Sequence, residues 1–182
     1  SKKDPFFKRV KLFYKKYVFV RDQLLEEANI EVNKKILDID ENFRIKTNKA
    51  EIYCIDNFLN HEESKELISL IKTSLRPSTI ASSGATADQN YRTSKTCDLG
   101  NLDNALLKDI DRRICCFLDI DHNFSEVIQG QFYEVGEEFK AHTDFFEKDQ
   151  IQEYGGARGQ RTYTFMVYLN DVEEGGETEF LH

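Results

Sequence analysis

The sequence lacks a long hydrophobic run, a leader segment and any disulfide framework. Its apolar runs are only a few residues long, well short of the ~20 residues that a membrane-spanning helix needs. No charged-then-apolar segment of the signal-peptide type precedes the domain. The four cysteines show no Cys-x-x-Cys spacing, and the adjacent Cys115 and Cys116 suit an ordinary disulfide poorly. These absences predict a cytoplasmic protein with reduced thiols and no membrane partner.

Positive charge is scarce outside the first 50 residues. The formal net charge is −8. Residues 1–50 carry 13 Lys and Arg against 8 Asp and Glu, whereas the rest of the chain carries 12 against 25. An acidic body repels phosphates, which disfavours a nucleic-acid partner. The basic start either docks an acidic partner or, as is commoner, forms the solvated face of a helix.

Residues 1–50 are predicted to be a helical extension and a linker. Asp4-Pro5 is a typical helix start, and apolar side chains recur at helical spacing from there to about Asn29. Residues 31–50 are polar and predict a linker. The apolar stripe over residues 5–28 needs a surface to cover, which is the rest of the chain, a second copy of it or a partner protein.

Residues 51–182 predict one α+β domain in which helices come first and antiparallel strands follow. A strand at 51–55 leads to a helix that begins at Asn60, where Glu63 completes a capping box. A second helical stripe covers residues 102–118. Alternation of apolar and polar residues then predicts strands at 126–135, 139–143, 161–169 and 177–181.

His142 and Asp144 are the pair on which the functional interpretation depends. In a strand, residues two apart point to the same face, so an imidazole and a carboxylate can bind one metal ion there. With a second His, such a pair forms the triad of non-haem iron enzymes, which leaves positions open for a cosubstrate and oxygen. On its own, the pair is more often solvated than bound to metal.

The motifs around this pair resemble those of the prolyl 4-hydroxylase family of Fe(II)- and 2-oxoglutarate-dependent oxygenases. In family order they are Tyr133-Glu134-Val135-Gly136, His142-x-Asp144-Phe145-Phe146, Gly159-Gln160-Arg161, Tyr168-Leu169-Asn170-Asp171-Val172 and Gly175-Gly176-Glu177-Thr178-Glu179-Phe180. The resemblance spans residues 51–181 and implies a double-stranded β-helix, or jelly roll, with supporting helices.

The resemblance implies a dioxygenase that hydroxylates prolyl residues in a peptide or protein, with oxidative decarboxylation of 2-oxoglutarate to succinate and CO2. It gives His142 and Asp144 the metal-binding and catalytic roles, and it implies Fe(II), 2-oxoglutarate and O2, with ascorbate as an additional cofactor. Arg92, in an Arg-Thr-Ser signature, is assigned to substrate binding, and the alternative is an ordinary surface arginine. Three residues match positions that bind the cosubstrate, and their alternative role is core packing: Tyr133, Tyr168 and Thr178.

The family pattern continues beyond Phe180 with a second iron-binding His and a Lys for the cosubstrate. His182 follows the last strand too closely to match that His. We therefore expect the jelly roll to be incomplete at its C-terminal end and this segment to be inactive, with the activity belonging to the complete protein. Two alternatives stay open, namely the same chemistry on another amino acid or small molecule, and an inactive jelly roll that binds peptides.

Overall fold

The computed structural model describes residues 9–14, 39–47, 51–80, 90–101, 103–146 and 150–181, with residues 9–14 and 101 described by their backbone alone. Contacts divide the chain into two compact units, one of residues 1–64 with 161–182 and the other of residues 65–160. The helices and strands are β1 (Arg9–Tyr14), β2 (Glu51–Asp56), α2 (His61–Thr73), β3 (Arg76–Pro77), β4 (Lys95–Asp98), α3 (Ala105–Leu118), β5 (Gln129–Phe132) and β6 (Thr164–Val167). None of the described helices is long and apolar enough to cross a membrane.

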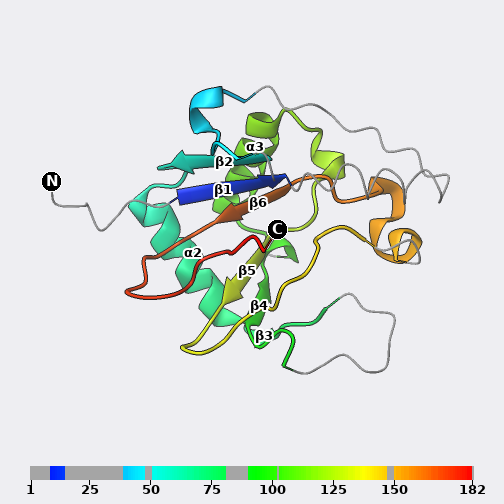
Figure 1. Cartoon of the computed structure of the whole chain (residues 1–182). Coiled ribbons are helices and arrows are strands. Elements are labelled where there is room, and N and C mark those ends of the chain that lie inside the picture. The colour runs from blue at the N-terminus through cyan, green and yellow to red at the C-terminus, as the bar shows by residue number, and fades with distance from the viewer. Residues whose placement is uncertain are drawn as a thin grey trace, which may run out of the picture. The chain divides into compact units, whose positions relative to one another are not determined.

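The first unit contains an antiparallel sheet of three strands in the order β2-β1-β6, with β1 in the middle (Figure 1). Ile52 of β2 is 6% exposed and lies at the centre of the core of this unit. Met166 and Phe180 pack against it. The rings of Phe58 and Phe165 add a tilted contact with centroids 4.9 Å apart.

The strand β1 corrects the helix that was expected over residues 4–29. Arg9 lies opposite Asp56 of β2, and Val10 lies opposite Val167 of β6. The segment Arg-Val-Lys-Leu-Phe-Tyr is rich in residues that also favour strands. Two flanking ladders of backbone hydrogen bonds outweigh the local helical pattern, because propensity is only a weak prior. The rest of the expected helix lies outside the described residues.

The two helices expected after residue 51 are confirmed, and so is the capping box predicted for the first of them. At the start of α2, the Glu63 backbone N–H donates to Asn60 Oδ1 over 2.9 Å, and the Asn60 N–H donates to Glu63 Oε2 over 2.7 Å. This reciprocal pair is the expected capping box. Asn104 caps α3 by accepting from the N–H groups of Leu106 and Leu107.

The second unit contains a separate antiparallel sheet in the order β3-β4-β5. It comes close to α2 at one glycine, since a Cβ placed on Gly130 of β5 would lie 2.2 Å from Cγ1 of Ile71. Gly130 therefore sets how closely the helix approaches the strand. The buried side chains of this unit include Leu67, Ile71, Cys97, Leu99, Leu107, Ile110 and Leu118.

The described residues thus form a mixed α and antiparallel β structure. Two of the expected strands differ. Residues 177–181 form no strand, and within 139–143 only Phe139 makes a β-bridge, opposite Arg92. Next to that bridge, the Glu138 N–H donates to the Thr93 hydroxyl over 2.9 Å instead of to a main-chain carbonyl. A side chain replaces one bond of the ladder, which stops the strand from extending.

Candidate metal centre

A tight turn positions the segment that carries His142. The Glu137 N–H donates to the Glu134 carbonyl over 3.0 Å, and Gly136 has φ +83°. A positive φ at the third residue of a four-residue turn is typical of a type II turn, and it favours glycine there. The chain then runs back beside residues 91–93, where the Lys140 N–H donates to the Tyr91 carbonyl over 3.0 Å. The segment leading to His142 is therefore attached to the segment that carries Arg92.

The side chains of His142 and Asp144 meet, although neither residue lies in a strand as the spacing argument assumed. His142 Nε2 lies 3.2 Å from Asp144 Oδ1, and the two side chains are 30% and 38% exposed. On the other side of the ring, Nδ1 lies 2.7 Å from the Lys140 carbonyl oxygen. A carbonyl cannot donate, so Nδ1 must carry the hydrogen of that bond. The lone pair of a neutral imidazole is then on Nε2, facing Asp144.

Either a proton or a metal ion between the two groups would satisfy this arrangement. A neutral Nε2 and a carboxylate oxygen are both acceptors, and two acceptors that face each other repel unless a proton or a metal ion lies between them. A metal-binding His usually donates its second ring N–H to a carbonyl or carboxylate, which fixes the ring orientation. The Lys140 carbonyl does this for His142. The donor set of His142 and Asp144 therefore fits a divalent metal ion.

Phe139 connects His142 to Arg92. Its ring is stacked on the imidazole of His142, with centroids 3.6 Å apart and an interplanar angle of 17°. The guanidinium carbon of Arg92 lies 4.6 Å from the centroid of the same ring. Tyr91 meets Phe139 edge-on at 5.9 Å. The stack fixes the imidazole plane and brings a cationic side chain to the same part of the site.

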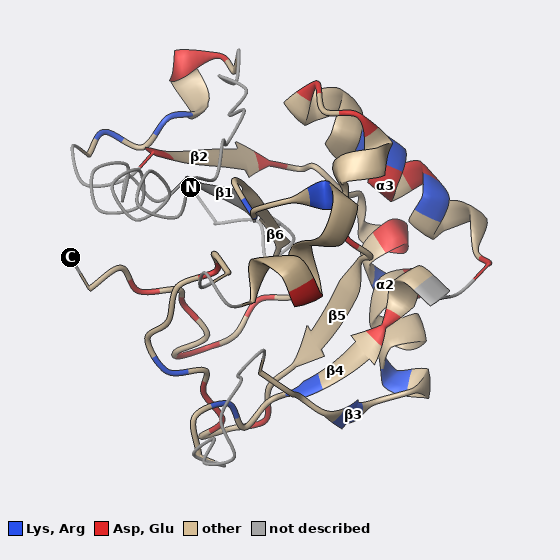
Figure 2. Ribbon diagram, turned by 90° about the vertical axis from the view of Figure 1, so that its right-hand side faces the viewer, with Lys and Arg blue, Asp and Glu red and all other residues tan. Residues whose placement is uncertain are grey.

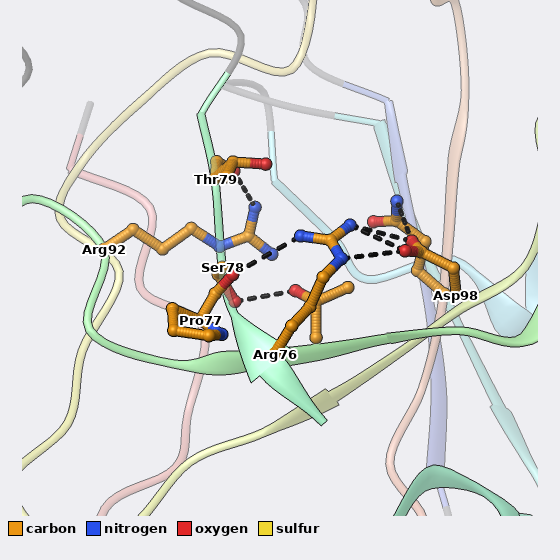
Figure 3. A network of polar contacts seen from close by, with 8 residues as sticks. Arg76, Pro77, Ser78, Thr79, Arg92 and Asp98 are labelled. Atoms are coloured by element: carbon orange, nitrogen blue, oxygen red, sulfur yellow. Dashed lines mark hydrogen bonds and ion pairs between the residues drawn. The ribbon is translucent and has the colours of Figure 1, made fainter. Parts of the chain in front are cut away.

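Arg92 is held by two of its three nitrogens. Nη1 donates to the Thr79 carbonyl over 2.9 Å, as Figure 3 shows, and Nε donates to Ser94 Oγ over 3.3 Å. Nη2 is buried and makes no hydrogen bond to any described residue. Burial lowers the pKa of the Arg92 guanidinium, and the charges of Tyr133 and Asp144 partly offset this. The free donor capacity of Nη2 is what a substrate-binding arginine needs.

The three expected cosubstrate residues fall in two places. Tyr168 and Thr178 meet in the first unit, where their hydroxyl oxygens are 2.7 Å apart. Tyr133 follows β5 in the second unit, is 42% exposed and donates to Gln131 Oε1 over 3.1 Å. Each hydroxyl already has a partner on this chain. Tyr168 and Thr178 thus form one polar pair in the first unit.

Comparisons with known proteins identify the family of this chain. Residues 128–182 match the family model described as the 2OG-Fe(II) oxygenase superfamily. The chain is 37% identical over 134 residues to a probable prolyl 4-hydroxylase 10 of Arabidopsis thaliana, covering 72% of this chain and 45% of that protein. It is 39% identical over 126 residues to a probable prolyl 4-hydroxylase 3 of the same plant, covering 68% and 43%. The chain belongs to the prolyl 4-hydroxylase-like branch of the 2OG-Fe(II) oxygenases.

Membership of the 2OG-Fe(II) oxygenases implies a jelly-roll fold, with Fe(II), 2-oxoglutarate and O2 as cofactor and cosubstrates. A mammalian relative, prolyl 4-hydroxylase subunit alpha-3 of Mus musculus, is 31% identical over 128 residues, covering 69% of this chain and 24% of that protein. The chain spans less than half the length of each of these relatives. No solved structure matches this oxygenase chain.

Two contributors to the site were missed by reasoning from the sequence. Phe139 was taken as a strand residue, although its place three residues before His142 allows its ring to stack on the imidazole. Gln160 lies in a recognised motif but was given no role. It accepts from the Phe146 N–H over 2.7 Å and donates to the Phe146 carbonyl over 2.8 Å. This two-bond clamp fixes the chain two residues after Asp144, and no sequence spacing predicts it.

Proposed function

We propose that the complete protein is an Fe(II)- and 2-oxoglutarate-dependent dioxygenase that hydroxylates prolyl residues in a peptide or protein. The observation that carries the proposal is the pairing of His142 Nε2 with Asp144 Oδ1 at 3.2 Å, with Nδ1 held by the Lys140 carbonyl. When bound, the iron and its cosubstrates supply the oxidative hydroxylation of a C–H bond, while 2-oxoglutarate becomes succinate and CO2.

The residues of this chain bind and orient the reactants. His142 offers a fixed lone pair and Asp144 a negative charge, so together they hold the metal on one face of their segment. We infer that Tyr168 and Thr178 donate hydrogen bonds to a cosubstrate carboxylate, because a buried carboxylate without such partners is costly. The cosubstrate role of Tyr133 stays a prediction from the family resemblance.

The finer architecture also belongs to this proposal. We infer that residues 51–182 are part of a jelly-roll oxygenase domain and that residues 1–50 form an extension, of which β1 joins the sheet of the first unit. Ascorbate as an additional cofactor, a cytoplasmic location and docking through residues 5–28 stay predictions. The free thiols of Cys54, Cys97, Cys115 and Cys116 support the location.

The metal role is tested by anaerobic titration of the complete protein with Fe(II), with and without 2-oxoglutarate. We expect a visible charge-transfer band that appears only when both are present. Substitutions His142→Ala and Asp144→Ala should each abolish it, whereas His61→Ala and Asp171→Ala, changed as matched controls, should leave it intact. Absence of the band from the unaltered protein would favour an inactive peptide-binding module.

The substrate class needs a separate assay. Succinate release should be stimulated by peptides that contain proline, and the same peptides with alanine in place of proline should give no stimulation. Equal stimulation by both sets would remove the prolyl assignment while leaving the cofactor chemistry in place. Stimulation by a different amino acid or a small molecule would then identify the alternative substrate.

Arg92 is proposed to bind the substrate through the unpaired donor on Nη2. Arg92→Lys keeps the charge but removes the planar group that bonds Thr79 and Ser94. We expect KM for a prolyl peptide to rise roughly tenfold, as the loss of about one hydrogen bond to a charged group predicts, with little change in kcat. Arg158→Lys is the control. An unchanged KM would make Arg92 a structural residue.

A further inference from the structure

A second cluster of metal-binding side chains lies at the C-terminal end of α3, apart from the His142 and Asp144 pair. Asp111, Cys115 and His122 each offer one ligand atom, and these atoms all lie within 4.8 Å of one another. Asp111 and Cys115 are one helical turn apart on α3, which puts them on the same face. His122 belongs to the short 3-10 helix η3 (His122–Phe124).

Backbone hydrogen bonds bring His122 back to the helix. Asp119 ends α3 in the left-handed conformation, with φ +48°. The Ile120 N–H then donates to the Cys115 carbonyl over 2.9 Å, which folds the chain against the last turn of the helix. Asp121 caps η3 by accepting from the Asn123 N–H over 2.8 Å. These backbone hydrogen bonds therefore bring the three ligand side chains close together.

The carboxylate of Asp111 is oriented by a further residue. Ser125 Oγ donates to Asp111 Oδ1 over 2.9 Å. This bond directs the other oxygen, Oδ2, toward His122, whose Nδ1 lies 2.5 Å away. The Cys115 residue is 9% exposed and the His122 side chain 75%. Cys115 is thus buried in the core, Asp111 is oriented by Ser125, and the side chain of His122 is exposed at the surface.

The neighbouring positive charges of α3 pair with a different carboxylate. Asp109 Oδ1 lies 2.6 Å from Arg112 Nη2, and Asp109 Oδ2 lies 3.2 Å from Arg113 Nε. Figure 2 shows acidic and basic residues interspersed along α3. Asp109 forms ion pairs with both arginines, whereas Asp111 forms its ion pair with His122. A cation bound between Asp111 and His122 would not have to displace either arginine from Asp109.

We propose that Asp111, Cys115 and His122 form a binding site for a borderline divalent ion of the Zn²⁺ class. The donor set of one sulfur, one nitrogen and one oxygen suits Zn²⁺ and is unsuited to Mg²⁺ or Ca²⁺. Zinc bonds are about 2.0–2.3 Å long, so the exposed His122 ring moves slightly outward to admit the ion. Three protein ligands leave the fourth tetrahedral position to water. The bound ion ties η3 to the end of α3.

Cobalt provides a test that separates this site from the oxygenase centre. The full chain, stripped of metal and kept reduced under anaerobic conditions, is titrated with Co²⁺ and then with competing Zn²⁺. A thiolate ligand gives Co²⁺ an intense near-ultraviolet charge-transfer band, which the nitrogen and oxygen ligands His142 and Asp144 cannot give. We expect this band in the unaltered chain and in a His142→Ala variant, and we expect Zn²⁺ to remove it.

Variants decide whether the three side chains are the ligands. Cys115→Ser should abolish the band, and Cys116→Ser, which changes the exposed neighbouring thiol, should keep it. His122→Ala alters a surface side chain and leaves the core intact, so it should bind Zn²⁺ at least ten times more weakly in the competition. Ser125→Ala should weaken binding by about 10- to 100-fold, as is usual for residues that orient a ligand.

Three results would overturn the proposal. The first is that the unaltered chain gives no thiolate band. The second is that the band survives in Cys115→Ser, and the third is that His122→Ala binds Zn²⁺ as tightly as the unaltered chain does. The first result would mean that Asp111 and His122 form only an ion pair and that Cys115 is a buried thiol that binds no metal. Circular dichroism checks that each variant is folded, and if Cys115→Ser does not fold, the His122→Ala affinity decides the question.

Discussion

The ring of Phe139 touches two functional side chains, with His142 stacked at 3.6 Å and Arg92 at 4.6 Å. Phe139→Leu keeps the apolar volume near the site but removes the flat surface that orients the imidazole. We expect iron affinity to fall by about 10-fold, the lower end of the range for residues that orient a metal ligand. Anaerobic Fe(II) titration of the complete protein measures it, with Phe132→Leu as a matched control. Equal affinities in the two variants would show that the stack has no orienting role.

The ionisation of Tyr53 is expected to lower stability at high pH. Burial, together with the hydrogen bond it donates to Glu51 and the charge of Glu51, raises its pKa from 10.0 to about 12. The residue is 3% exposed, and its hydroxyl lies 2.8 Å from Glu51 Oε1. The raised pKa contributes stability that is complete below pH 10 and is lost as pH rises toward 12.

The Tyr53→Phe variant cannot ionise at this position and isolates the effect. We expect the unaltered chain to lose roughly 2–3 kcal/mol more of its free energy of unfolding between pH 10 and pH 12 than the variant loses, from about two pKa units. Urea unfolding at several pH values measures the difference. If the free energy of unfolding changed with pH in the same way in both proteins, the Tyr53 hydroxyl would ionise as it does in water.

Among the secondary-structure elements, α2 and β5 are coupled through Gly130. A Cβ at this position would lie 2.2 Å from Ile71 Cγ1 and 2.7 Å from its Cδ1. Gly130→Ala should therefore destabilise the second unit by about 1–3 kcal/mol, the usual cost of overpacking. Ile71→Ala removes the clashing atoms and should cost about 2–5 kcal/mol on its own.

The double variant tests whether the close approach is the cause. If it is, Gly130→Ala should cost much less once Ile71 is alanine, because only the Ile71 Cβ at 3.3 Å remains close. The double variant should then be more stable than the sum of the single changes predicts. Urea unfolding of the unaltered protein, the two single variants and the double variant measures this departure from additivity, which is the coupling energy of the two positions. Strictly additive costs would show that Gly130 is needed for its backbone and not for the space it leaves.

Sequence reasoning was most successful where the signal is local. Asn60 and Glu63 correctly predicted the start of α2, because a capping box involves residues only three apart. His142 and Asp144 also meet, but outside any strand, so the strand geometry assumed for them was wrong. Sequence reasoning failed where contacts between residues far apart in the chain determine the local structure. Residues 9–14 carry helical and strand patterns together, and only pairing with β2 and β6, far away in the sequence, selects the strand. The Gln160 clamp on Phe146 depends in the same way on a contact 14 residues away.

At the scale of the whole chain, β1 is the element that joins distant parts of the sequence. It pairs with residues 51–56 on one side and with 164–167 on the other. Without it, the edges of β2 and β6 that pair with β1 would also be unpaired, and exposed edges tend to pair with other chains. The first sheet therefore depends on a segment that lies outside the region of family resemblance.

A proline at the centre of β1 tests this dependence. Leu12 lies opposite Tyr53 in one ladder and opposite Phe165 in the other. Leu12→Pro removes an N–H and fixes φ, which central strands do not tolerate. We expect a loss of roughly 1–3 kcal/mol, the cost of leaving a buried partner unsatisfied, and faster amide exchange in both β2 and β6. Leu12→Thr keeps the N–H and should preserve the slow exchange. If the two variants exchanged alike in residues 51–56 and 164–167, β1 would not hold the two strands together.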